Sequence, residues 1–245
     1  MKQIRIISIA FCCVFFSSIS YSNTKIAFLT YDPPFVISPH EGFDIDLAHL
    51  LCKQIPLECQ FVFLKNSQQI YEALKNGQVD LALSGITISA ARKKNFIFSL
   101  PYLLSKGQFL TLKQSNINSL SALKGSAIGI IKDELSGGVF YSYIANNFPD
   151  AFKINQYSSV EDMFAALSNK SIAAVFLYRS DVNYWNLNGH NSFKTLGPVV
   201  TLGEGFAVMA TPRSENLIRQ INKVLLHIEQ DSSYLKLYET YFSNQ

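Results

Sequence analysis

The most informative segment of the chain is Leu74-Lys75-Asn76-Gly77-Gln78-Val79-Asp80-Leu81-Ala82-Leu83-Ser84-Gly85-Ile86-Thr87-Ile88-Ser89-Ala90-Ala91-Arg92-Lys93-Lys94. Its parts read, in order, as a helix end, a tight turn, a buried strand, a polar loop and a helix start. Gly85 lets backbone approach a ligand closely, and Arg92 carries a planar guanidinium that can grip a carboxylate bidentately. Ser84 and Thr87 offer hydroxyls, and Ser89 is a candidate N-cap. The stretch predicts a small anion site, although an ordinary strand-to-helix turn with a solvated arginine fits the same residues.

A second, degenerate copy of this unit lies further along the chain, because residues 164–177 are similar in sequence to residues 71–84. Residues 25–30 and 127–132 each read as the opening strand of one unit. In open α/β sheets ligands sit beyond the carboxyl ends of the strands. The segments 84–87 and 177–181 are therefore expected to face each other across a cleft, unless this is a chance similarity between buried strands.

The first 22 residues have the pattern of a secretory signal peptide. Lys2 and Arg5 precede an apolar run at 6–19, and small residues follow at 20 and 22. The run is too short for a comfortable membrane span. Phe11 before Cys12 disfavours a lipoprotein, so the sequence predicts a soluble exported protein in the periplasm.

Composition excludes several classes of function. Loss of Lys2 and Arg5 with the leader lowers the formal charge from +3 to +1, which gives no basic surface for nucleic acid. A hydrophobic content of 48% and an aromatic content of 13% argue against disorder. The histidines, at 40, 49, 190 and 227, are scattered, so neither a metal cluster nor a cofactor is expected.

Two cysteines, Cys52 and Cys59, remain after the leader is removed. In an oxidising compartment this pair is expected to form a local disulfide between a helix end and the next strand. Metal binding and two free buried thiols are the alternatives, and metal binding is disfavoured because no other ligand stands nearby at suitable spacing.

Elsewhere, residues 42–51 have helical apolar spacing with Asp44 and Asp46 in the first turn, where acids suit the helix dipole. The proline-rich loop Tyr31-Asp32-Pro33-Pro34-Phe35 leaves the first strand, and Phe35 could form either a cleft wall or core. Strands are expected at 108–112 and 206–210, and helices at 214–229 and 232–242. The second unit is inserted between the first unit and this tail, so two connections should cross between lobes and form a hinge.

Taken together and in order, these motifs resemble the periplasmic solute-binding proteins of ABC importers, specifically the polar amino-acid family (bacterial extracellular solute-binding protein family 3). The motifs that carry the resemblance are residues 33–35, 42–47, 76–80, 85–88 with Arg92, 98–102, 123–125 and 233–239. The Cys52 to Cys59 spacing also resembles the disulfide of the lysine/arginine/ornithine and histidine binders.

The resemblance implies an α/β fold of the type II periplasmic-binding-protein class, with two lobes joined by a two-crossing hinge around the ligand cleft. Lobe 1 would comprise residues 23–105 plus 204–245, and lobe 2 residues 106–203. A monomer that captures an amino acid or related small carboxylate and delivers it to an inner-membrane ABC permease is expected. Neither catalysis nor a cofactor is implied.

By position, Arg92 would grip the α-carboxylate, aided by the backbone at Gly85 and Thr87. Ser84 and the Thr87 hydroxyl would share the ammonium and carboxylate contacts. In lobe 2, the loop at 132–138 would offer backbone N–H groups at a helix start. The remaining candidate ligand-binding residues are Asp32, Phe35, Ser136, Tyr178 and Asp181.

The chain departs from the family pattern at three places. A Gly-Thr-Thr type loop is replaced by Lys132-Asp133-Glu134-Leu135-Ser136-Gly137-Gly138, which adds two acids. The position of the usual ammonium-binding aspartate holds Tyr178, so the missing charge would have to come from Asp181, Asp133 or Glu134. The site where relatives stack an aromatic ring falls at Asn66 or Ser67, so a cationic side chain would lose that partner.

Two other functions fit the same fold. A cyclohexadienyl dehydratase-like enzyme would also use Arg92, with Glu134, Asp133 or Glu204 as its acid or base. A ligand-sensing module that docks on a membrane receptor would share every pocket residue with a transporter subunit. Neighbouring genes for a permease and an ATPase would distinguish a transporter subunit from a sensor.

Overall fold

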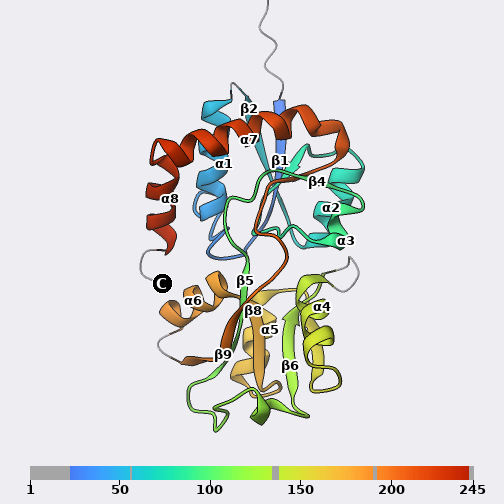
Figure 1. The fold of residues 1–245 in the computed structure, drawn as a ribbon, viewed down its shortest axis with the longest axis vertical. Helices are drawn as coiled ribbons and strands as arrows, with labels where there is room; N and C mark the ends of the chain where they lie inside the picture. The colour runs from blue at the N-terminus through green and yellow to red at the C-terminus, as the bar shows by residue number, and fades with distance from the viewer. Residues whose placement is uncertain (1–22, 56, 134–137, 190–191, 243–245) are drawn as a thin grey trace, which may run out of the picture.

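The computed structural model describes residues 23–55, 57–133, 138–189 and 192–242. It contains two five-stranded sheets, each flanked by helices, which form two lobes placed one above the other (Figure 1). The predicted leader lies outside the described residues. No helix in the described part of the chain has the length and apolar character needed to cross a bilayer.

The sheet of the first lobe has the strand order β2-β1-β3-β10-β4. β1 pairs in parallel with β2 and β3, whereas β10 is antiparallel to β3 and β4. The strands are β1 (Asn23–Leu29), β2 (Glu58–Leu64), β3 (Leu81–Ala82), β4 (Ile97–Phe98) and β10 (Met209–Ala210). The helices are α1 (Phe43–Gln54), α2 (Ser67–Lys75), α3 (Ala90–Lys93), α7 (Glu215–Gln230) and α8 (Ser233–Phe242), with a 3-10 turn at Pro212–Ser214.

The sheet of the second lobe has the order β7-β6-β8-β5-β9. β6 pairs in parallel with β7 and β8, and β5 is antiparallel to β8 and β9. The strands are β5 (Lys106–Leu112), β6 (Ala127–Ile131), β7 (Lys153–Tyr157), β8 (Ala174–Tyr178) and β9 (Phe193–Thr201). The helices are α4 (Gly138–Asn147), α5 (Val160–Ser168) and α6 (Arg179–Asn188), with a 3-10 turn at Ser121–Leu123.

The two copies predicted from this sequence similarity occupy equivalent places. Helix α2 leads into β3, which lies parallel to the opening strand β1 of its sheet. Helix α5 leads into β8, which lies parallel to β6, the corresponding strand of the second sheet. Both helices begin at a side-chain cap, Asn66 and Ser159, which accept backbone N–H groups of the first turn.

The chain passes between the sheets twice, at 99–105 and 202–208, and Figure 1 shows these segments running side by side. Phe206 connects them, since its N–H donates to Leu103 O (2.8 Å) and its carbonyl accepts from Tyr102 N (2.8 Å). Leu202 N donates to Ser105 O at 3.0 Å. The crossings are thus hydrogen-bonded as a pair, which suits a hinge.

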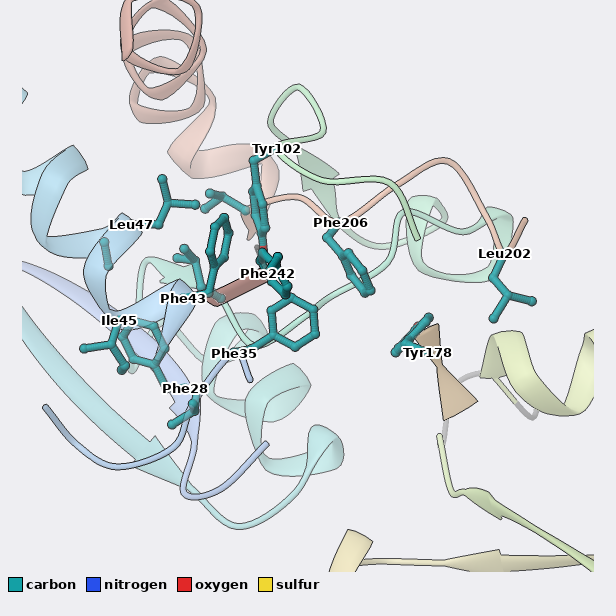
Figure 2. Close-up of a cluster of buried hydrophobic side chains, with 14 of the residues drawn as sticks. Phe28, Phe35, Phe43, Ile45, Leu47, Tyr102, Tyr178, Leu202, Phe206 and Phe242 are labelled. Carbon is teal, nitrogen blue, oxygen red and sulfur yellow. The ribbon is translucent and has the colours of Figure 1, made fainter. Parts of the chain in front are cut away.

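A continuous apolar cluster connects the lobes, because Tyr178 at the end of β8 packs on Phe206, with ring centroids 4.7 Å apart. Figure 2 shows Tyr178 directed toward Phe206 and the first-lobe aromatics. Phe35 is fully buried in this cluster, 4.8 Å from Phe206 between ring centroids. Phe35 is therefore core, and the expectation that it forms a cleft wall is wrong.

The predicted disulfide is formed. Cys52 on α1 is bonded to Cys59 on β2, with Cα atoms 6.2 Å apart. The bridge joins the end of a helix to the following strand, as expected from the spacing in the sequence.

Candidate functional site

A cavity of about 80 Å³ lies between the lobes, beyond the carboxyl ends of β1, β3, β6 and β8. It is lined by Leu29, Asp32, Ser67, Ile70, Tyr71, Ser84, Gly85, Ile86, Arg92, Ile131, Lys132, Asp133, Val139, Phe140, Tyr178 and Asp181. A second cavity, of about 200 Å³, shares Leu29, Asp32, Ser67, Ile131, Lys132 and Asp181 and adds Glu161 and Lys65 among its walls. The two form one cleft walled by both lobes.

Arg92 is held in place by the short helix that carries it. Ser89 caps α3 by accepting Arg92 N–H at 3.3 Å, which confirms the predicted N-cap. The guanidinium, only 7% exposed, donates from Nε to Tyr71 Oη (3.0 Å) and from Nη1 to Thr87 O (2.7 Å). Nη2 donates to Asp133 Oδ2 at 2.5 Å. Burial lowers the pKa of Arg92, but Tyr71 and Asp133 raise it more, so the side chain stays charged.

Asp133 reaches this arginine from the opposite lobe, just after β6. Its other carboxylate oxygen accepts from Tyr71 Oη at 3.0 Å, so two first-lobe donors hold one second-lobe carboxylate. Gly138, at the start of α4, makes room for it. A Cβ at Gly138 would lie 2.4 Å from the Asp133 Cβ. Burial, together with Asp133, raises the pKa of Tyr71 to about 12, so its hydroxyl remains a donor.

The polar groups at Ser84 and Gly85 stabilise the loop that carries them. Ser84 Oγ accepts Leu29 N–H at 2.8 Å, and Gly85 N–H donates to Asp44 Oδ2 at 2.7 Å. Gly85 has φ +54°, and a Cβ there would lie 2.7 Å from the Phe35 ring. Both residues line the cavity, and the Gly85 N–H expected to contact ligand donates to Asp44 instead.

Asp44 supports this loop from the first turn of α1, as predicted for a helix-start acid. It is fully buried and also accepts from Tyr102 Oη at 2.9 Å. Burial raises the pKa of Asp44 to about 7, although the bonds from Gly85 and Tyr102 act in the opposite direction.

Thr87 and Tyr178 form a second polar contact across the cleft, with their hydroxyl oxygens 2.5 Å apart. Thr87 is fully buried and does not line the cavity, so its hydroxyl faces Tyr178 and its carbonyl faces Arg92. Burial raises the pKa of Tyr178 above its ordinary value, which keeps the phenol neutral. The Thr87 hydroxyl expected to contact ligand instead joins the lobes.

Asp32 and Asp181 line both parts of the cleft, Asp32 from the loop after β1 and Asp181 from the first turn of α6. Asp181 is buried and accepts from Ser180 Oγ at 3.1 Å. Burial raises the pKa of Asp181 to about 8. Burial and then the charge of Asp181 raise the pKa of Asp32 well above its ordinary value.

The structure thus brings six of the predicted site residues to one cavity: Asp32, Ser84, Gly85, Arg92, Tyr178 and Asp181. Phe35 and Thr87 are buried behind it, and Ser136 lies outside the described residues. Sequence reasoning missed Tyr71, which appeared only as the first residue of the repeated unit. Glu204, a candidate acid of the enzyme alternative, forms an exposed ion pair with Lys93.

Comparisons with known proteins place this geometry in context. Residues 24–244 match the family model described as bacterial extracellular solute-binding proteins, family 3. The ABC transporter arginine-binding protein 1 of Escherichia coli K12 is 30% identical over 205 residues, which cover 82% of this chain and 81% of that protein.

Solved structures have the same two-lobed architecture. An arginine 3rd transport system periplasmic binding protein from Legionella pneumophila is 33% identical with a TM-score of 0.82, covering 90% of this chain and 99% of that one. The GluR0 ligand-binding core from Nostoc punctiforme, solved with L-glutamate, is 25% identical with a TM-score of 0.79 and covers 91% and 100% of the two chains. The expected two-lobed type II fold is therefore confirmed.

Proposed function

Because the chain belongs to the bacterial extracellular solute-binding proteins of family 3, we propose that it is the periplasmic substrate-binding component of an ABC importer. It captures a small polar ligand of the amino-acid class, or a close chemical relative of one, and delivers it to a membrane permease. The observation that carries this proposal is a charge-lined cavity walled by both lobes beside two hydrogen-bonded crossings. The name of the arginine-binding relative from Escherichia coli supports the transport role.

Capture in this proposal proceeds by hinge closure. Ligand meets the first-lobe wall around Arg92 and Asp32, after which the second lobe closes and brings Asp181 over it. Closure is favoured only by contacts that exist in the closed state, and the Thr87–Tyr178 and Arg92–Asp133 contacts belong to this class. The crossings at 99–105 and 202–208 act as the hinge.

Export by a cleaved leader at residues 1–22 is part of the same proposal. Lys2 and Arg5 ahead of the apolar run support it, as does the disulfide between Cys52 and Cys59, which suits an oxidising compartment. We infer that the exported chain acts as a monomer.

The direct test is a thermal-shift screen of refolded, dialysed protein against amino acids, small carboxylates and amines. A ligand that raises the melting temperature and is recovered unchanged supports the proposal. Conversion of the ligand would favour the dehydratase-like alternative, and failure of every compound to bind would contradict capture of this class.

A matched pair of variants ties binding to the cavity. Arg92→Ala removes the ion pair to Asp133 across the lobes and two bonds within the first lobe, to Tyr71 and Thr87. It is expected to weaken binding of the ligand found in the screen at least tenfold, because the closed state loses its inter-lobe contact. Arg219→Ala removes an exposed arginine on α7, paired with Glu215, and should leave affinity unchanged. Wild-type affinity in Arg92→Ala would contradict the assigned pocket.

A ligand-sensing role is the second candidate, favoured by the likeness to the GluR0 ligand-binding core. A sensor would use the same cleft and the same closure, but its closed form would dock on a receptor. Genes for a permease and an ATPase beside this one would support transport, and a receptor gene in that position would support sensing.

A further inference from the structure

The basic groups that line the 80 Å³ cavity already have partners within the protein. The basic side chains that line the 80 Å³ cavity are Arg92 and Lys132. Arg92 is paired with Asp133 at 2.5 Å, and Lys132 also has an interaction partner. A ligand carboxylate approaching Arg92 would meet the Asp133 carboxylate first, and like charges at such separations repel strongly in a buried site.

Asp133 is built into this position. Its side chain is 10% exposed, and Arg92 and Tyr71 each donate to one of its oxygens, at 2.5 and 3.0 Å. Gly138 leaves the space that a Cβ would fill. A ligand that displaced Asp133 would have to replace two hydrogen bonds, and the Asp133 carboxylate would lose both of its donors. The Asp133 carboxylate thus takes the position at Arg92 that a bound carboxylate would otherwise occupy.

The acidic groups of the cleft, by contrast, have no ion-pair partner among the described residues. Asp32 and Asp181 approach from opposite lobes, and neither forms an ion pair with a described residue. Asp181 is buried and Asp32 is partly buried, and the charge of Asp181 raises the pKa of Asp32 further. A cation placed between them would favour the ionised form of both carboxyls and replace the hydration that they have lost.

We propose that the ligand is a small organic cation without a carboxylate, an alkyl amine or guanidine, whose charged group lies between Asp32 and Asp181 while Asp133 stays on Arg92. This inference rests on the proposed function and names its substrate class. The described residues hold no group of three or more His, Cys, Asp or Glu side chains suited to a metal ion. Two carboxylates also supply few of the oxygens that hard metal cations require, which favours an organic cation.

The adjoining 200 Å³ cavity gives such a molecule room to extend. Glu161 and Lys65 line it, together with Asn66, Ser67 and Ser159. Glu161 at this end can accept a second cationic group, so diamines and aminoalkylguanidines fit the acidic groups of the whole cleft.

The test compares pairs of compounds that differ only in the α-carboxylate: arginine with agmatine, lysine with cadaverine, and ornithine with putrescine. Calorimetry on wild-type protein, unfolded and refolded to remove bound ligand, gives the affinity ratio within each pair. We expect the amine of at least one pair to bind tenfold or more tightly than its amino acid. Equal or tighter binding of the amino acid in every pair that binds overturns the inference and leaves the proposed function standing.

A variant that removes the protein carboxylate at Arg92 tests whether a ligand carboxylate can then take its place. Asp133→Asn leaves Arg92 without an anion, so the affinity ratio should shift at least tenfold toward the amino acid, whatever the loss of overall affinity. Asp162→Asn is the matched control, an exposed acid on α5 that lines neither cavity. An unchanged ratio in Asp133→Asn, with melting cooperative, overturns the inference. Failure of both members of every pair to bind wild-type protein overturns the inference, whereas the proposed function falls only if the broader screen of amino acids, small carboxylates and amines also finds no ligand.

Discussion

The Asp133 carboxylate of the second lobe lies 2.5 Å from Nη2 of Arg92 in the first lobe, and this ion pair joins the two walls of the cleft. Tyr71 donates to the same carboxylate and also accepts from Arg92. The three side chains form a closed hydrogen-bonded ring of interactions across the lobe boundary. Such a pair contributes to closure even before ligand is considered, because it is lost when the lobes separate.

Opening of the unliganded protein is expected when this pair is removed. Asp133→Ala deletes the bonds to Arg92 and Tyr71, so the population of open molecules should rise. Small-angle X-ray scattering without ligand would detect a larger radius of gyration than in wild type. Asp162→Ala, on the exposed face of α5, should scatter like wild type. Identical scattering from Asp133→Ala and wild type would contradict a closing role for the pair.

Substitution of Gly85 should cost more stability than substitution of an unhindered glycine. Gly85→Ala combines a left-handed φ of +54° with a Cβ 2.7 Å from the Phe35 ring. Gly125→Ala has a similar φ of +78° but no atom within 4 Å, so it isolates the backbone strain. We expect a loss of about 1–2 kcal/mol for Gly125→Ala and about 1–3 kcal/mol more for Gly85→Ala, where the core must also shift. Urea unfolding measures the free energy of unfolding of both variants. Equal losses would mean that the Phe35 ring moves away from the new Cβ without cost.

The disulfide is expected to contribute modestly. Cys52 and Cys59 are separated by seven positions, and a loop this short constrains the unfolded chain by only about 2 to 3 kcal/mol. The Cys52→Ser/Cys59→Ser double variant should lose that much free energy of unfolding. A thiol assay on protein lacking residues 1–22, unfolded without reductant, provides the check. Two reactive thiols per chain would show that the bond does not form.

Cation binding should strengthen as pH rises. Burial raises the pKa of Asp181 to about 8, so this carboxyl holds a proton at neutral pH that a bound cation would expel. Burial and the charge of Asp181 also raise the pKa of Asp32, which acts in the same direction. Affinity for an amine is therefore expected to increase from pH 5.5 to 8, with protons released on binding. Calorimetry in two buffers of different ionisation enthalpy measures this release. Binding without proton release would show that the charged group of the ligand does not lie at these carboxylates.

The same carboxyls act in the opposite direction on the empty protein. An acid with a raised pKa is more protonated in the native state than in the unfolded chain, so its stabilising contribution is present at low pH. That contribution is lost as pH rises from the ordinary value of 3.8 toward about 8 for Asp181. Without ligand, the melting temperature of wild type should thus fall more steeply between pH 5 and 8 than that of Asp181→Asn.

Other charged groups around this pair define the background of that experiment. Asp44 and Glu161 also raise the pKa of Asp32, and Lys65 and Lys132 line the same walls. Asp44 titrates near pH 7 and contributes in the same direction in both proteins. The difference between wild type and Asp181→Asn is therefore the informative quantity, and parallel melting curves would contradict the raised pKa of Asp181.

Local patterns were sufficient to predict most of the fold. The repeated helix-strand unit, the amphipathic helix α7 and the Ser89 cap each depend on residues close in sequence, because hydrophobic spacing and capping act within a few turns. The Cys52–Cys59 bridge is local for the same reason. The motif order along the chain was enough for the family and for the two-lobed fold.

Sequence patterns alone are enough to predict that this chain folds into two similar α/β lobes and that Arg92 and the loop before it lie at their junction. What each polar group contacts there follows from the packing of the two lobes. Asp133 meets Tyr71 and Arg92, which are far from it in the chain. Ser84 Oγ accepts from Leu29 N–H, and Gly85 N–H donates to Asp44. Which buried donor meets which acceptor depends on how the two lobes pack, and a local pattern of residues does not predict contacts between segments far apart in the chain.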